Sequence, residues 1–403
     1  MKNKQYVPRS LEPELQAAAA EFPVVMVTGP RQSGKSTLLQ HVFGDKRYLT
    51  LDDPVQRKLA LDDPRLFLEN AGDSCVIDEI QYTPELPSYI KMEVDKNRRR
   101  NGRFILTGSQ HFPLMQNISE SLAGRVATYE LLPFAWREAG IPDSLIVADC
   151  FKMLYRGFYP DPLVHGVDRN RYYSSYLQTY IERDIRQIMA VHDLRRFQDF
   201  VELVAARAGS LLNLNEIAKE CGVSFPTAKR WLSLLESSRI IFLLRPFHSN
   251  ISKRVIKSPK LYFVDTGLLS YLLRYPDAET MRSGPMAGAF FENFIVAEAL
   301  KHQSNHRTPY ELYFYRDSNR NEIDLVVEYA QRFLLIEIKL TKTPRTADTD
   351  GIMRQMPFFR KARGSLLSFS ETSTKLNDKV GIVPWTHLTG LLDSVAEGVN
   401  ANE

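Results

Sequence analysis

Little in this chain of 403 residues points to disulfides, a membrane or a strongly charged partner. Its three cysteines form neither a Cys-x-x-Cys zinc pattern nor an even disulfide set, which favours a reducing compartment. The first residues lack the apolar run of a signal peptide, and no stretch approaches the roughly 18 apolar residues of a membrane span. With 52 basic and 48 acidic residues the net charge is only +4, so any basic surface must be local. These absences predict a cytoplasmic protein without a membrane partner.

The order of apolar runs predicts an α/β protein of two or three domains. Residues 22–140 alternate short apolar runs with helical stretches, as in a parallel sheet wrapped by helices. Residues 145–205 are helical in pattern, and a helix at Ala289–Leu300 precedes strand-like runs near 311–316, 322–329 and 332–340. The strands expected earlier in the chain are Val24–Thr28, Arg47–Leu51, Cys75–Asp78, Phe104–Thr107, Thr128–Leu131 and Ile240–Leu244.

The strongest motif is GPRQSGKS, which matches G-x-x-x-x-G-K-[ST] between an apolar strand and a helix. Its glycines let successive backbone N–H groups face phosphates, and the helix N-terminus adds partial positive charge. Lys35 would reach the β- and γ-phosphates, and the Ser36 hydroxyl would ligate Mg²⁺. The motif therefore predicts ATP with Mg²⁺, held by Gly29, Pro30, Arg31, Gln32, Ser33, Gly34, Lys35, Ser36 and Thr37.

The run CVIDEIQ places two acids at the carboxyl end of an apolar strand, where ligands bind in such sheets. Asp78 suits the magnesium contact, and Glu79 suits the polarisation of an attacking water. The alternative is that the pair merely caps a helix.

Two further polar positions follow predicted strands. In FILTGSQ, Ser109, or with less support Thr107, is a candidate sensor of the γ-phosphate; a simple turn at Gly108 is the alternative. Arg125 in SLAGR precedes the fifth strand, where it could stabilise transition-state charge in a neighbouring subunit. That role requires a homo-oligomer, and otherwise Arg125 is an ordinary surface arginine.

Residues 214–244 read as helix, glycine-containing turn, helix and strand, with Ser224 capping the second helix. Thr227, Lys229 and Arg230 would face outward, as on a recognition helix in a DNA major groove. The alternative is a winged helix that acts as a lid or protein contact. The residues expected to form a basic wing are Arg245, His248, Lys253, Arg254 and Lys257.

An acid-x-Lys pattern lies in the C-terminal part. Glu337 and Lys339 are two residues apart on one strand and so share a face, and Asp324 can meet them from the preceding strand. With Glu292 on the preceding helix, the pattern resembles the PD-(D/E)xK nuclease core. Glu292, Asp324 and Glu337 would then hold Mg²⁺ or Mn²⁺, and Lys339 would orient water. A fold of this kind can persist without its chemistry, so cleavage and an inert module both stay open.

The order of motifs along the chain resembles one widespread bacterial and archaeal group of predicted AAA-type ATPases with a C-terminal domain of unknown function. The resemblance extends from about Tyr6 to Lys342 and implies an ASCE-type P-loop core. Arg183 in YIERD is a hallmark of the group; an ion pair with Asp184 or Glu182 is favoured over a phosphate contact. The motifs are YVPR, GPRQSGKST, LTLDDP, IDEIQ, LTGSQ, SLAGR, RGFYPDP, YIERDI and YFVDTGL.

The resulting prediction is a P-loop AAA-type ATPase core with helices on both faces of a parallel sheet (1–140), and a helical lid (141–205). A winged helix-turn-helix (206–282) and a restriction-endonuclease-like α/β domain (283–403) would follow. Its function would be an ATP-hydrolysing switch or remodeller that acts on DNA through the last two modules and assembles as a homo-oligomer. The nuclease-like domain would either cleave DNA or only bind DNA or protein. A nucleotide-binding protein with almost no turnover is a third possibility.

Overall fold

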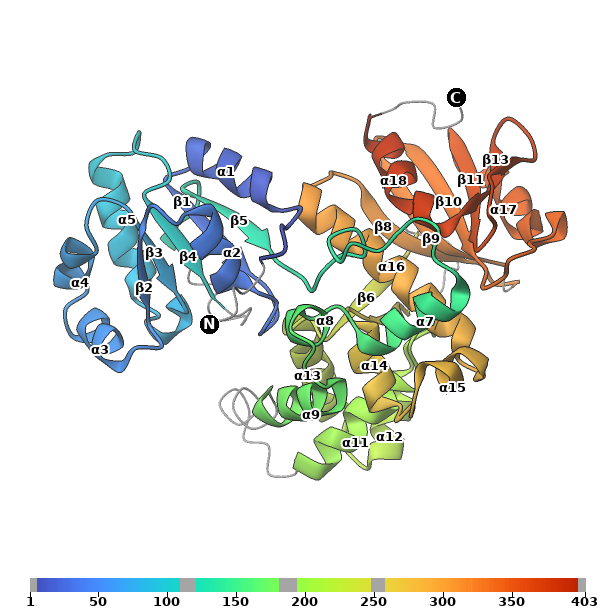
Figure 1. The fold of residues 1–403 in the computed structure, drawn as a ribbon, viewed down its shortest axis with the longest axis horizontal. Coiled ribbons are helices and arrows are strands. Elements are labelled where there is room, and N and C mark those ends of the chain that lie inside the picture. Colours follow the sequence, from blue (N-terminus) through green and yellow to red (C-terminus); the bar gives the residue numbers. More distant parts are fainter. Residues whose placement is uncertain (1–5, 109–120, 181–193, 248–257, 320, 398–403) are drawn as a thin grey trace. The chain divides into compact units, whose positions relative to one another are not determined.

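The computed structural model describes residues 6–108, 121–180, 194–247, 258–319 and 321–397. It divides into two compact units (Figure 1). Unit 1 comprises Met1–Phe134 with Ser237–Ile240 and Ser304–His306, and unit 2 comprises the remainder of the chain. Several expectations lie outside the described residues, namely those for Ser109, Glu182, Arg183, Asp184, His248, Lys253, Arg254 and Lys257.

Unit 1 is built on a five-stranded parallel sheet in the order β2-β3-β4-β1-β5. The expected parallel sheet is confirmed, and β1, β3 and β4 have the predicted bounds. β2 ends one residue early, and β5 begins two residues before its predicted start. Because the strands are parallel, the carboxyl ends of β1, β3 and β4 lie along one edge. The strands are β1 (Val24–Thr28), β2 (Arg47–Thr50), β3 (Cys75–Asp78), β4 (Phe104–Thr107) and β5 (Val126–Glu130).

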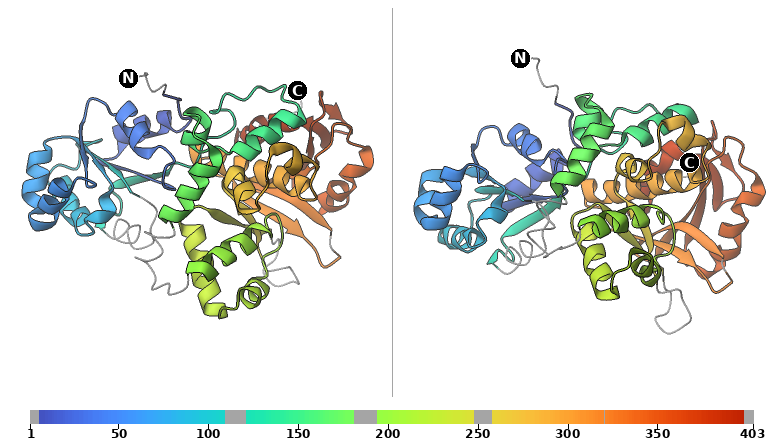
Figure 2. Two further views of the ribbon diagram at one scale, coloured as in Figure 1. Left: turned by 60° about the horizontal axis from the view of Figure 1, so that its bottom comes forward. Right: turned by 90° about the horizontal axis from the view of Figure 1, so that it is seen from below.

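Alternate residues of the central strands are buried on opposite faces of this sheet. Val24 and Met26 belong to one apolar cluster, and Val25 and Val27 belong to another. Helices cover both faces (Figures 1 and 2), as predicted. These are α1 (Glu12–Glu21), α2 (Lys35–Val42), α3 (Pro54–Asp62), α4 (Pro64–Ala71) and α5 (Leu86–Lys96).

The first part of unit 2 is helical and contains the predicted helix-turn-helix. Gly222 adopts φ 66° after the first helix, and the Thr227 N–H donates to the Ser224 hydroxyl at 3.3 Å, so Ser224 caps the second helix as expected. Lys229 and Arg230 are exposed. The helices are α7 (Val147–Arg156), α8 (Pro160–Val164), α9 (Arg169–Tyr180), α11 (Leu194–Ala205), α12 (Leu214–Cys221), α13 (Phe225–Ser237), α14 (Thr266–Leu272) and α15 (Ala278–Ser283).

An eight-stranded mixed sheet forms the rest of unit 2, in the order β12-β13-β11-β10-β9-β8-β6-β7. Sequence reasoning did not foresee that β6, which follows the helix-turn-helix, would pair with β8 and extend this sheet. The strands are β6 (Ile241–Pro246), β7 (Lys260–Phe263), β8 (Glu311–Arg316), β9 (Glu322–Tyr329), β10 (Arg332–Ile338), β11 (Ala362–Ser368), β12 (Thr374–Lys375) and β13 (Val380–Pro384). The associated helices are α16 (Ala287–His306), α17 (Asp350–Gln355) and α18 (Leu388–Glu397).

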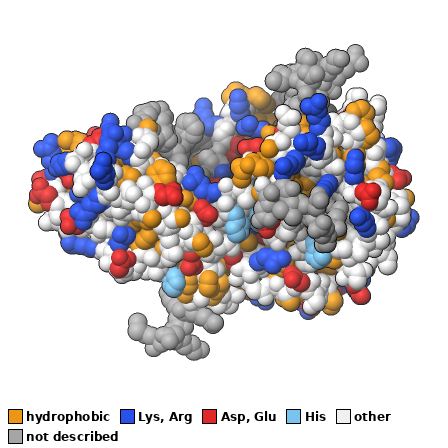
Figure 3. Space-filling view, turned by 90° about the horizontal axis from the view of Figure 1, so that it is seen from above, with side chains coloured by type: hydrophobic (Ala, Val, Ile, Leu, Met, Phe, Trp, Pro, Cys, Tyr) orange, Lys and Arg blue, Asp and Glu red, His pale blue; other side chains and the backbone are white. Residues whose placement is uncertain are grey.

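Charges of both signs are mixed on the surface. On the face in Figure 3, basic and acidic side chains are interspersed, in keeping with the small net charge. Within the described ranges, none of the helices combines the length and hydrophobicity that crossing a membrane requires.

Candidate functional site

The loop between β1 and α2 has a backbone that depends on its glycines. Gly29 has φ 138°, and a Cβ there would lie 2.2 Å from the Leu131 carbonyl oxygen. Gly34 has φ 96° and immediately precedes α2. Both conformations are costly for residues with side chains, so the glycines are needed to curl this loop. The loop is thereby placed directly before the N-terminus of α2, where anions bind favourably.

Lys35, the first residue of α2, is 6% exposed. Its ammonium donates to the carbonyl oxygens of Gly29 at 3.1 Å and Pro30 at 2.8 Å. Burial lowers the pKa of Lys35 to about 8, although the nearby Glu79 and Asp78 act in the opposite direction. Neutral partners hold this ammonium, so an anionic phosphate could replace them with a gain in electrostatic energy.

The Asp78 carboxylate is the centre of a set of hydroxyl groups at the carboxyl edge of the sheet. Ser36 donates to it at 2.9 Å, and the hydroxyls of Thr107 and Tyr48 also donate. The four side chains come from α2, β3, β4 and β2, and Asp78 itself is 4% exposed. Carboxylate and hydroxyl oxygens are the hard ligands that Mg²⁺ prefers, so Ser36 and Asp78 fit the predicted ion.

Glu79 has a strained backbone beside this set. Its φ of 62° is left-handed, a conformation that non-glycine residues rarely adopt and that occurs often at functional sites. Burial raises the pKa of its carboxyl, while Lys35 and a hydrogen bond from Gln81 lower it. Although Glu79 precedes the short helix Ile80–Tyr82, its side chain makes no capping hydrogen bond. The simple capping interpretation is therefore wrong for Glu79.

Three residues that contact this site were not among the predicted site residues. The Tyr48 hydroxyl donates a hydrogen bond to Asp78, and the Gln81 amide donates one to Glu79, as described above. Arg9 is 5% exposed and donates to the carbonyl oxygens of Ser33 at 3.0 Å and Leu132 at 2.6 Å, which links the loop to the chain after β5. The only signal for Arg9 was its place in the YVPR motif.

The structure bears differently on the predictions for Thr107, Ser109 and Arg125. Thr107 lies in the site through its bond to Asp78, whereas Ser109 is outside the described residues. Arg125 precedes β5 and so lies at the opposite edge of the sheet from the loop. Its guanidinium forms a two-point pair with Asp95 at 2.8 and 2.9 Å, which lowers the pKa of Asp95 to about 2. A role in a neighbouring subunit stays a prediction.

The predicted acidic residues of unit 2 are brought together, with a lysine among them. Lys260 on β7 is 2% exposed. Its ammonium lies 2.9 Å from Glu292 Oε1, 2.5 Å from Glu322 Oε1 and 3.8 Å from Asp324 Oδ1. Burial alone would lower the pKa of Lys260, but Glu292, Asp324 and Glu322 raise it overall. Neither Lys260 nor Glu322 was predicted from the sequence.

Glu337 and Lys339 lie beside this acidic cluster. The Lys339 ammonium donates to Glu337 Oε1 at 2.7 Å, and the Ile338 N–H donates to Asp324 Oδ2 at 2.9 Å. Burial raises the pKa of both Asp324 and Glu337. In the part of the chain that the structure describes, no three His, Cys, Asp or Glu side chains are arranged to hold a metal ion. As arranged here, these acids are paired with Lys260, and a metal site at Glu292, Asp324 and Glu337 stays a prediction.

The fold and the first site together define the class of the protein. A strand, a glycine-dependent loop and a helix that begins with Lys-Ser lie beside a strand that ends in Asp-Glu, within a parallel sheet. This is the arrangement of a P-loop ATPase.

Comparison with known proteins gives the family. Residues 21–140 match the model of an AAA domain, and residues 147–279 and 287–388 match two domains of unknown function, DUF8612 and DUF4143. Uncharacterized protein Rv2008c of Mycobacterium tuberculosis is 32% identical over 393 residues, which cover 96% of this chain and 86% of that protein. Uncharacterized protein Mb2031c of Mycobacterium bovis gives the same values. The chain belongs to the family of these AAA-domain proteins, as its motifs led us to expect.

Similarity to solved structures is more distant. The Walker-type ATPase PABY2304 of Pyrococcus abyssi is 16% identical with a TM-score of 0.42, covering 68% of this chain and 97% of that one. The Holliday junction branch migration motor RuvB of Thermotoga maritima is 16% identical with a TM-score of 0.26, covering 59% and 86%. The assignment rests on the family model and the mycobacterial relatives.

Proposed function

We propose that the protein hydrolyses ATP with Mg²⁺ and works as a nucleotide-driven switch whose C-terminal domain binds DNA without cleaving it. The observation that carries the first part is the Asp78 carboxylate, bound by Ser36 and Thr107 beside Lys35 and Glu79. In this proposal residues 29–37 hold the phosphates, and Ser36 and Asp78 hold Mg²⁺. The bound ion supplies positive charge against the phosphate oxygens.

Each side chain of the site has a distinct role in this proposal. The Lys35 ammonium exchanges its two carbonyl partners for phosphate oxygens. The Glu79 carboxylate accepts a proton from the attacking water, and Gln81 holds that carboxylate in place. Thr107, which bonds Asp78 and also accepts the Glu79 N–H at 3.3 Å, connects the two acids and would sense the γ-phosphate.

Substitution of Glu79 tests the hydrolytic role. Glu79→Gln keeps the size of the side chain but removes the base, so turnover should fall by about 100- to 10,000-fold while ATP binding persists. Lys35→Ala should lose binding as well. Glu85→Gln, at an exposed position nearby, is the matched control. Unchanged turnover in Glu79→Gln would refute the role, and background turnover in the wild type would leave only a nucleotide-binding protein.

The acidic cluster supports the absence of cleavage in this proposal. An ammonium placed among Glu292, Glu322 and Asp324 already neutralises part of their charge. A divalent ion bound to the same oxygens would repel Lys260 at short range, where the interior screens charge poorly. Arg316 adds a further cation, at 2.9 Å from Glu322. The domain thus carries its own cations where the predicted nuclease would need a metal.

Plasmid DNA tests the absence of cleavage. We expect wild-type protein with Mn²⁺ and ATP to leave supercoiled plasmid intact, and Asp324→Ala to behave the same. Mn²⁺ added without nucleotide should leave the melting temperature unchanged. Nicking by the wild type that disappears in Asp324→Ala would overturn this part and establish a metal-dependent nuclease. Loss of nicking in Lys35→Ala as well would show that ATP controls the cleavage.

A further inference from the structure

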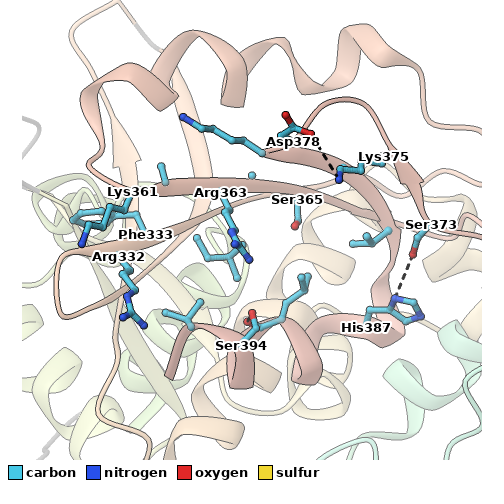
Figure 4. A pocket seen from close by; sticks show the side chains of 18 of the residues that line it. Arg332, Phe333, Lys361, Arg363, Ser365, Ser373, Lys375, Asp378, His387 and Ser394 are labelled. Carbon is cyan, nitrogen blue, oxygen red and sulfur yellow. Dashed lines mark hydrogen bonds and ion pairs between the residues drawn. The ribbon is translucent and has the colours of Figure 1, made fainter. Parts of the chain in front are cut away.

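A hollow of about 840 Å³ lies in the C-terminal part of unit 2, between the sheet and α18 (Figure 4). Its walls are the first residues of β10 and β11, the β12–β13 hairpin, and α18. In Figure 4, Arg363 and Ser365 stand on β11 in the middle of the hollow, with Ser394 facing them from α18. We call it the basic pocket because its charged side chains are mostly cationic, namely Arg332, Lys361, Arg363, Lys375 and Lys379, with the single carboxylate of Asp378.

Few acidic side chains line the basic pocket. Asp378 is fully exposed and approaches Lys375 at 3.8 Å. Arg332, Lys361 and Lys379 make no ion pair within the described residues, although basic and acidic residues are almost equal in number over the whole chain. Like charges gathered in a hollow raise its positive potential, which attracts an anion.

Strand register places these side chains together. β10 and β11 are parallel, and Leu334 pairs with Arg363 while Ile336 pairs with Ser365. Arg363 and Ser365 therefore lie on one face of the sheet, because side chains alternate along a strand, and Lys361, just before β11, also lines the pocket. On β13, Gly381 pairs with Ser365 and contributes no side chain at that point of the lining. The pocket thus offers several cations and hydroxyl groups.

The same register separates the basic pocket from the acidic cluster. Glu337 follows Ile336 and so points to the opposite face from Arg363 and Ser365. A ligand in the pocket would not be positioned at the acids. This agrees with a domain that binds DNA but does not cleave it.

We propose that the basic pocket binds consecutive phosphate groups of a duplex DNA backbone. The inference deepens the proposed function, since it names the surface with which the C-terminal domain would hold DNA. Cations distributed over three strands suit a row of phosphates better than one isolated anion. Phe333, the one aromatic six-membered ring in the lining, is 9% exposed and offers little surface for stacking on a base. Recognition would therefore depend on charge and not on DNA sequence.

Fluorescence anisotropy of a short labelled duplex with full-length protein, without nucleotide, tests the proposal. Arg332→Glu combined with Lys361→Glu should weaken binding at least tenfold and make the slope of log K against log salt shallower by about 2, since each phosphate contact contributes about 0.9. Both residues are exposed, so the fold should tolerate the change. The matched control, Arg65→Glu with Arg99→Glu, alters the charge equally at exposed positions of unit 1 and should leave binding within twofold. A third variant, Lys229→Glu with Arg230→Glu on α13, tests the competing prediction that the helix-turn-helix holds the DNA.

The possible outcomes distinguish the explanations. An equal loss in the pocket variant and the unit 1 control, or a loss only in the α13 variant, would overturn the assignment. Absence of duplex binding by the wild type, together with binding of inorganic phosphate measured by calorimetry, would also overturn it, in favour of a small-anion site. ATP turnover is measured in the same samples: unchanged turnover in the pocket variant shows an intact fold. Failure of DNA binding with normal turnover would refute this inference and leave the ATPase proposal standing.

Discussion

The phosphate loop of unit 1 and the acidic cluster of unit 2 contain the same kinds of groups, carboxylates and a buried lysine, but they hold the lysine differently. Lys35 donates to two neutral carbonyl oxygens, whereas Lys260 lies among three carboxylates. A neutral hydrogen bond contributes about 0.5–1.5 kcal/mol, and loss of one partner from a buried ion pair costs about 3–5 kcal/mol. Lys35 can therefore change partners when a phosphate arrives, and Lys260 is fixed.

This difference separates a site that depends on its ligand from one that is complete without it. In the proposed function, ATP with Mg²⁺ would supply both the phosphate for Lys35 and the metal for Ser36 and Asp78. In the acidic cluster, Lys260 supplies the positive charge from within the chain. The proposal therefore depends on the position of the nearest lysine as much as on the acids.

The largest effect is expected from Lys260→Met, which removes the lysine that distinguishes the acidic cluster from the phosphate loop. The ammonium is lost and the acids remain buried, so the free energy of unfolding should fall by about 3–5 kcal/mol at neutral pH. Chemical denaturation measures the loss, with exposed Lys219→Met as control. We also expect Mn²⁺ to raise the melting temperature of this variant but not of the wild type. A variant as stable as the wild type would show that Lys260 is not the counter-ion of the cluster.

A smaller effect, on the first site, is expected from Gln81→Ala. Gln81 bonds the Glu79 carboxylate, and a hydrogen bond to a charged group is worth about 1.5–3 kcal/mol. If it positions the base, kcat should fall about tenfold or more while KM for ATP stays unchanged. Steady-state kinetics measure both, and Gln178→Ala, at an exposed position, is the control. A rise in KM alone would instead place Gln81 in nucleotide binding.

The pH dependence of ATP binding sharpens the contrast further. The pKa of Lys35 is lowered to about 8 in the free protein, and a bound phosphate would raise it. Affinity should therefore be constant below pH 8 and fall by at most tenfold per pH unit above it, with protons taken up on binding. Calorimetry in two buffers of different ionisation enthalpy measures that uptake. Lys35→Arg, which stays charged, should bind ATP without this proton uptake.

The smallest effect is expected at Arg125. Its pair with Asp95 is near the surface, so Arg125→Ala should change stability little. If Arg125 reaches a neighbouring subunit, turnover in the variant should fall only at protein concentrations at which the wild type assembles. Turnover measured across a dilution series tests this, with light scattering to follow assembly. An equal loss at every concentration would place its effect within one chain.

Local sequence predicted most of unit 1. The apolar runs gave strands at or within two residues of their predicted bounds, and the three with the predicted bounds, β1, β3 and β4, are buried along their whole length. The loop from Gly29 to Ser36 was predictable because its glycines and its Lys-Ser pair act within a few residues of one another. Ser224 was likewise identified as a cap, since capping involves only the next helical turn.

Tertiary structure alone decided which partners the charged groups have. Lys260 lies beside Asp324 and Glu292 because β7 is added to the end of a sheet that is formed mainly by later residues. No local sequence pattern predicts that Lys260 pairs with these acids. Tyr48 and Arg9 joined the first site for the same reason. The sequence by itself determined the strands, the loop and the residues able to bind phosphate, since these follow from short-range sterics and burial. The fold decided which opposite charge lies near each buried charge, because electrostatic partners depend on distance in space and not on separation along the chain.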